Sequence, residues 1–201
     1  DTAQRLHEAG AAGIFLEDQA WPKKCGHFSG KQVIPAADWL SKLQAVIDLR
    51  AEGVDLFLVA RTDARAAESL EEAIARAIAA ASLGVDAIFV EAPRSADELA
   101  RIRDGVPADI RVANMIAGGK TPMLDGERLA ELGHRLVVTP LSGLLASAAA
   151  LRGAYHALAA GELPDSGTPP ALGFDEFGDV VGLPAQRELE RRYAGPDALT
   201  R

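Results

Sequence analysis

Several features are scarce in this sequence, and each scarcity excludes a class of protein. The 201 residues include one cysteine, so no intramolecular disulfide framework can form, and a reducing cytoplasm is the expected location. No apolar run approaches the roughly 18 residues of a membrane-spanning helix, and we expect no signal peptide. The 21 basic residues are outnumbered by 29 acidic ones, which argues against nucleic acid as a partner. We therefore expect a soluble, cytoplasmic protein with neither a membrane nor a nucleic-acid partner.

Five short apolar runs recur along the chain, each preceded by glycine or a polar turn. Most are nearly continuous rather than alternating, which is typical of strands buried on both faces of a parallel sheet. The predicted strands are Gly13–Leu16, Leu56–Ala60, Ala87–Val90, Ile110–Ala113 and Leu136–Val138.

Segments with helical periodicity separate these runs. Apolar residues spaced three and four apart between Leu70 and Ala81 predict one helix. Strand and helix therefore alternate, as in α/β folds made of repeated βα units. The predicted capping boxes and helix ends are Ser69 with Glu72, Ser95 with Glu98, Gly84 and Gly133.

Five strands are too few to close an eight-stranded barrel, and Thr2–Ala9 has the pattern of the end of a crossover helix. We predict an α/β fold, a (β/α)8 TIM-type barrel that lacks its N-terminal strands in this chain. Residues 1–162 are predicted to be a partial barrel that carries catalysis. Residues 163–201 are predicted to be a linker and a C-terminal helical tail, packed on its own barrel or swapped between subunits.

Polar side chains follow every predicted strand. The carboxyl ends of strands in a parallel barrel meet at the catalytic face, where carboxylates suit Mg²⁺ and an arginine can bind a carboxylate. Any one of these residues could instead cap a strand or be solvated, but five strand ends in register favour a site. The residues are Glu17, Asp18, Arg61, Thr62, Asp63, Glu91, Asn114 and Thr139.

The single cysteine lies in the loop Lys23-Lys24-Cys25-Gly26-His27. Neighbouring cations would favour the thiolate, which suits a proton-transfer group, and glycines would let such a loop close. A lone cysteine is otherwise most often a small buried apolar residue, so spacing alone leaves both alternatives open. Trp21 and Trp39 are predicted to be packing residues.

At these residues the chain resembles the isocitrate lyase/phosphoenolpyruvate mutase superfamily. The Lys-Lys-Cys-Gly-His loop is the specific motif, and the other segments support it collectively. The matching segments run in order to about Ala160, and tail segments also look like the short members of that family. They are Leu16–Gln19, Pro22–His27, Ala60–Ala64, Phe89–Ala92, Ala113–Met115 and Pro140–Ser142, with Phe174–Phe177 and Val181–Leu183 in the tail.

The resemblance implies a barrel enzyme whose last helix is swapped between subunits of a homo-oligomer, a tetramer or a dimer. It implies Mg²⁺, with Mn²⁺ as the alternative ion, and a small carboxylate substrate. Carried over position by position, the implied roles are proton transfer by Cys25 with support from His27 and Lys24, substrate contacts from Gly26, Arg61, Glu91 and Asn114, and metal binding through water by Glu17.

The superfamily's principal metal-binding aspartates lie upstream of the matched segments and are absent from this chain, so we expect N-terminal strands to be missing here. The implied reaction is carbon–carbon bond cleavage of a small 2-hydroxy di- or tricarboxylate, resembling 2-methylisocitrate, dimethylmalate or isocitrate, to an α-oxo acid and a second carboxylate. The alternatives are an oxaloacetate hydrolase or decarboxylase, a phosphonomutase on the same fold, and a non-catalytic barrel remnant.

Overall fold

The computed structural model describes residues 1–24, 30–162 and 172–193. The chain divides into two compact units, Asp1–Ser142 and Gly143–Arg201. The parallel sheet belongs to the first unit.

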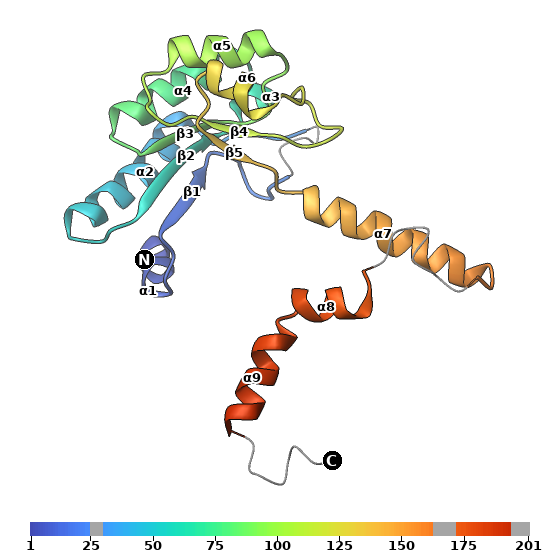
Figure 1. Cartoon of the computed structure of the whole chain (residues 1–201). Coiled ribbons are helices and arrows are strands. Elements are labelled where there is room, and N and C mark those ends of the chain that lie inside the picture. The colour runs from blue at the N-terminus through green and yellow to red at the C-terminus, as the bar shows by residue number, and fades with distance from the viewer. Residues whose placement is uncertain (25–29, 163–171, 194–201) are drawn as a thin grey trace. The chain divides into compact units, whose positions relative to one another are not determined.

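Among the described residues, five parallel strands lie side by side in chain order (Figure 1). A parallel bridge between Ile88 and Arg111 joins a three-stranded ladder to a two-stranded one. Every strand overlaps a predicted run, so the prediction of a parallel α/β fold is confirmed, and closure into a barrel stays a prediction. The strands are β1 (Gly13–Glu17), β2 (Phe57–Thr62), β3 (Ala87–Val90), β4 (Val112–Asn114) and β5 (Leu136–Val138).

Helices alternate with these strands, and the predicted caps are present. The helices of the first unit are α1 (Thr2–Glu8), α2 (Ala36–Ala51), α3 (Ala64–Ala67), α4 (Leu70–Ser82), α5 (Ala96–Gly105) and α6 (Gly126–Glu131). The hydroxyls of Ser69 and Ser95 each accept a hydrogen bond at 3.1 Å, from the backbone N–H of Glu72 and Glu98 respectively. Gly84, after α4, has a φ of 89°, a left-handed conformation that glycine adopts without strain.

The two faces of the sheet pack against different partners. Leu58 and Ala60 of β2 belong to the main core, together with Trp39 of α2 and Ile102 of α5. Val59 points to the opposite face and packs in a separate cluster on β2–β4. Because side chains alternate along a strand, this parity decides which residues can reach the site.

The packing prediction is confirmed for Trp39 and wrong for Trp21. Trp39 is fully buried, and its indole Nε1 donates a hydrogen bond to the Leu16 carbonyl at 3.2 Å. Trp21 is 84% exposed, because it follows β1 in an irregular segment that none of the described helices covers.

A buried carboxylate joins the ends of β1 and β2. Asp18 is fully buried and accepts hydrogen bonds from the Thr62 hydroxyl at 2.6 Å and from the Asp63 backbone N–H at 2.8 Å. Arg76 of α4 contributes a charged contact at 3.2 Å. Burial raises the pKa of Asp18 above its ordinary value, although these hydrogen bonds and the Arg76 charge oppose the change. The strand ends are therefore held in place by a polar cluster beneath the site.

The second unit contains α8 (Phe174–Val180) and α9 (Leu183–Tyr193), so the predicted C-terminal tail is helical in these ranges. It also contains most of α7 (Ser142–Ala159), a helix with no buried residue. Residues 163–171, where the predicted linker begins, lie outside the described residues. No helix in the described part of the chain is long and apolar enough to cross a membrane.

The buried side chain of His134, just after α6, makes the free energy of unfolding depend on pH. It is 3% exposed, and its Nδ1 lies 3.0 Å from the Leu132 carbonyl, which can only accept, so the neutral ring carries its proton on Nδ1. Burial lowers the pKa of His134 from 6.5 to about 4, against the opposing effect of the Leu132 hydrogen bond.

Because the folded-state pKa is depressed, stability is full above the unfolded value of 6.5 and is lost as the pH falls toward about 4. Between about pH 7 and pH 4, the free energy of unfolding should fall by about 3 kcal/mol more in the wild type than in His134→Asn. Urea denaturation of both proteins at the two pH values measures this difference in the free energy of unfolding. The contributions of the carboxylates are common to both proteins and cancel. Equal losses would contradict this account of His134.

Candidate functional site

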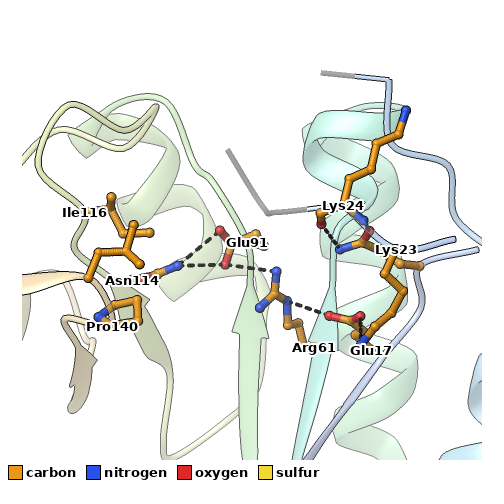
Figure 2. Close-up of a pocket in the computed structure, with 10 residues that line it drawn as sticks. Glu17, Lys23, Lys24, Arg61, Glu91, Asn114, Ile116 and Pro140 are labelled. Carbon is orange, nitrogen blue, oxygen red and sulfur yellow. Dashed lines mark hydrogen bonds and ion pairs between the residues drawn. The ribbon is translucent and has the colours of Figure 1, made fainter. Parts of the chain in front are cut away.

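A cavity of about 430 Å³ opens at the carboxyl ends of the strands. Figure 2 shows that side chains from separate strands converge on it. Charged and amide side chains come from the strand ends and from the segment after β1, and three apolar or imino residues complete the wall. The lining residues are Glu17, Gln19, Lys23, Lys24, Arg61, Glu91, Asn114, Ile116, Pro140 and Leu141.

Arg61 lies between carboxylates. Its Nε is 3.0 Å from Asp63 Oδ2 and 3.4 Å from Glu17 Oε2, and its Nη2 is 3.6 Å from Glu91 Oε2. Its guanidinium carbon also lies 5.0 Å from the ring centroid of Phe89, within cation–π distance. Burial disfavours the charged form, but the hydrogen bond and charge of Asp63, with Glu91 and Glu17, hold the pKa of Arg61 above its ordinary value. Arg61 therefore remains a cation suited to binding a carboxylate.

Glu91 and Asn114 form a buried pair beside Arg61. The Asn114 Nδ2 donates to both carboxylate oxygens of Glu91, at 3.2 and 3.3 Å. Because a carboxylate only accepts, this contact fixes the amide orientation. Asn114 Oδ1 is buried and has no hydrogen-bond partner among the described residues. The site thus presents an acceptor that a substrate hydroxyl could use.

Ala92, directly after Glu91, has a φ of 57° and is buried. For an alanine this left-handed conformation costs on the order of 1–2 kcal/mol, and such strain clusters at functional sites. The chain therefore turns sharply where the Glu91 side chain enters the cavity.

The segment after β1 carries the remaining charged lining. Lys23 Nζ is 2.5 Å from Glu17 Oε1. The Gln19 amide clamps the backbone of Lys24, accepting from its N–H at 2.9 Å and donating to its carbonyl at 3.0 Å. The Lys24 ammonium donates to the Gly30 carbonyl at 2.8 Å. Lys24 is thereby joined to Gly30 and, through Gln19, to the segment that follows β1.

Five of the eight predicted site residues meet at this cavity, namely Glu17, Lys24, Arg61, Glu91 and Asn114. The other three, Cys25, Gly26 and His27, lie outside the described residues.

Some predicted strand-end residues do not line the cavity, because side chains alternate between the two faces of a strand. Asp18 and Thr62 are buried on the helix side of the sheet, and neither they nor Thr139 line the cavity. Ile116 and Leu141 also line the cavity but were not predicted as site residues, because they come from loops after β4 and β5 whose paths the sequence does not specify.

The described residues do not by themselves make a metal site. They contain no group of three or more acidic, histidine or cysteine side chains that could hold an ion. Glu17 contributes one buried oxygen that accepts no hydrogen bond, but that oxygen is already beside Lys23. This arrangement allows Glu17 to bind a metal ion through water. The described residues do not supply a complete set of metal ligands.

Two curated relatives show how this chain compares with known proteins. The carboxyvinyl-carboxyphosphonate phosphorylmutase of Arabidopsis thaliana is 46% identical, over 96% of this chain and 57% of that protein. The 2,3-dimethylmalate lyase of Eubacterium barkeri is 35% identical, over 96% of this chain and 66% of that protein. The chain therefore spans about three-fifths of the length of these relatives. The first is described as chloroplastic, so a cytoplasmic location for this chain stays a prediction.

Solved structures give the same architecture. Oxaloacetate acetylhydrolase bound to 3,3-difluorooxalacetate matches with a TM-score of 0.84 and 29% identity, over 98% of this chain and 66% of that one. Phosphonopyruvate hydrolase in complex with oxalate and Mg²⁺ matches with a TM-score of 0.74, over 96% of this chain and 69% of that one. At 22% identity, the second likeness shows the fold alone.

The family model for phosphoenolpyruvate phosphomutase matches residues 1–159, which is most of the sequence and includes every residue of the cavity. The relatives named above are lyases, mutases and hydrolases that share its fold. The chain belongs to the phosphoenolpyruvate phosphomutase family, within the PEP mutase/isocitrate lyase superfamily.

Proposed function

We propose that this protein is a Mg²⁺-dependent carbon–carbon lyase. Its substrate would be a small 2-hydroxy di- or tricarboxylate of the 2-methylisocitrate, dimethylmalate or isocitrate type, cleaved to an α-oxo acid and a second carboxylate. One observation carries the proposal: Arg61, a carboxylate-binding cation, lines the same cavity as Lys24, which directly precedes Cys25 in the sequence.

The cavity suits such a substrate in three respects. Arg61 is a cation whose Nη1 is not engaged by Asp63 and can donate to a substrate carboxylate. Asn114 Oδ1, buried without a partner among the described residues, can accept the hydrogen of the 2-hydroxyl group. Ile116 and Leu141 provide an apolar wall for an alkyl substituent. The proposed metal would take further ligands from outside the described residues.

The proposed reaction transfers one proton at each of two atoms. A base removes the proton of the 2-hydroxyl, and the oxygen forms a carbonyl as the adjacent C–C bond breaks. The electron pair of that bond moves to the carbon beside the second carboxylate, whose oxygens delocalise the charge. The Cys25 thiol then gives its proton to this carbon, supported by His27, Lys24 and the backbone N–H of Gly26.

Two alternatives on the same fold have support from the comparisons. The match to oxaloacetate acetylhydrolase favours hydrolysis of oxaloacetate, and the 46% identical relative is a phosphorylmutase. Each reaction has different products: oxaloacetate hydrolysis releases oxalate and acetate, and phosphonomutase chemistry makes or breaks a C–P bond. A non-catalytic remnant would release no product from any of these substrates.

We expect purified protein with Mg²⁺ or Mn²⁺ to release an α-oxo acid from 2-methylisocitrate, dimethylmalate or isocitrate. A coupled dehydrogenase assay follows the release of the α-oxo acid. Cys25→Ser should lower turnover by about 100-fold or more while substrate still binds, because a positioned proton donor typically contributes that much. An unchanged rate in Cys25→Ser would reject the cysteine as donor. Oxalate or a C–P product in place of the α-oxo acid would reject the lyase.

Arg61→Lys should raise KM for the carboxylate substrate at least about tenfold, because a charged hydrogen bond contributes about 1.5–3 kcal/mol and lysine lacks the planar fork. The matched control is Arg65→Lys. Arg65 also forms a two-bond pair, with Glu98 at 2.6 and 2.7 Å, but it does not line the cavity. Equal effects of the two substitutions on KM would contradict the proposed role of Arg61.

The proposed partner is a second copy of the chain, held through the helical tail as the family resemblance implies. On α7 the apolar residues Leu144, Leu151 and Tyr155 are 65%, 56% and 66% exposed. Sedimentation should give a dimeric or tetrameric mass, and Leu151→Glu should reduce it because burying that charge is costly. Arg152→Gln, on the same helix, is the control. A single-chain mass for the wild type would contradict the proposal.

A further inference from the structure

Asp63 is a fully buried carboxylate held between two cations. Arg61 donates to it through Nε at 3.0 Å and Nη2 at 3.3 Å. Lys31 Nζ lies 2.8 Å from Asp63 Oδ1, and the side chains of this pair are 1% and 0% exposed. Asp63 also occupies the N-cap position of α3, yet its side chain makes no capping hydrogen bond there. Its carboxylate is therefore committed to the two cations rather than to the helix.

This arrangement fixes how Arg61 faces the cavity. A guanidinium has a planar fork of donors, so two hydrogen bonds from Nε and Nη2 to one carboxylate determine the plane of the group. Nη1 is the nitrogen that Asp63 does not engage. Asp63 itself does not line the cavity, whereas Arg61 does. Asp63 can therefore influence a bound anion through the position of Arg61, without touching the anion itself.

Lys31 links the same carboxylate to the segment beside the cavity. Residues 18–20 and 32–34 pair in antiparallel fashion, with Ala20 N–H donating to Gln32 O and Ile34 N–H donating to Asp18 O, both at 2.8 Å. Lys31 stands at the end of that pairing. A buried lysine is costly unless an anion compensates its charge. Asp63 supplies that anion and so ties the paired segment to the strand that carries Arg61.

We propose that Asp63 is a positioning residue for carboxylate recognition: it holds the Arg61 guanidinium in the orientation that receives the substrate carboxylate, with Lys31 as its buried counter-ion. This inference rests on the proposed carboxylate-binding role of Arg61. It extends the site by two residues that touch no substrate.

The test uses Asp63→Asn, which keeps the shape of the side chain and removes its charge. The first measurement is the Arg61 Nε–H resonance in a ¹⁵N spectrum, assigned by its disappearance in Arg61→Lys. We expect that signal to be protected from exchange with water in the wild type and to broaden or vanish in Asp63→Asn. The second is calorimetric binding of oxalate, the simplest dicarboxylate, whose affinity should fall at least about tenfold, as for a lost charged contact.

Two further variants separate positioning from folding. Asp63→Asn alone removes a negative charge that lies 2.8 Å from the buried Lys31 ammonium, which could unfold the protein. The double variant Lys31→Met with Asp63→Asn removes one charge of each sign, so it should fold while oxalate binding stays weak. Glu98→Gln is the matched control, because Glu98 likewise takes two hydrogen bonds from one arginine, away from the cavity, and oxalate affinity should not change.

The outcomes distinguish this inference from the proposed function. An Arg61 signal that is unprotected in the wild type, or unchanged in the double variant, overturns the positioning role whatever the enzyme does. Wild-type oxalate affinity in the folded double variant overturns it as well. Failure of the lyase assay with intact oxalate binding would reject the proposed reaction and leave the role of Asp63 standing.

Discussion

The site depends on two buried carboxylates, Asp18 and Asp63, at the ends of neighbouring strands. Asp18 accepts the backbone N–H of Asp63, and each carboxylate is compensated by buried cations from other parts of the chain. Such pairs add little net stability, because desolvation offsets the attraction, but removal of one partner is strongly destabilising. Their contribution is geometric. They hold β1, β2 and the segment beside the cavity in one arrangement, and Asp63 also takes two hydrogen bonds from the Arg61 guanidinium.

Much of the fold could be predicted from the sequence because its signals are local. Each strand is a short apolar run, and the two serine caps and the glycine helix ends depend on residues within four positions of one another. The parallel arrangement followed from alternation of strand and helix. Closure of a barrel requires contacts among strands, which local patterns do not carry.

The site was predictable only in part, for a related reason. Glu17, Arg61, Glu91 and Asn114 share the parity that directs side chains to one face of the sheet, so a list of strand ends contained them. The same list contained Asp18 and Thr62, whose parity directs them to the helices. Lys31 gave no signal, because a lysine is normally exposed and its partner lies 32 residues away. Burial of a charge by a distant counter-charge is a property of the folded chain.

The cavity wall has two origins. Its charged members stand on the strands or on the segment clamped by Gln19, and they are interlocked through shared hydrogen bonds. Ile116, Pro140 and Leu141 stand on loops beyond β4 and β5. Loops tolerate exchange better than strands joined by buried charges. The apolar part of the cavity wall can therefore diverge between related proteins without disturbing the interlocked charged part.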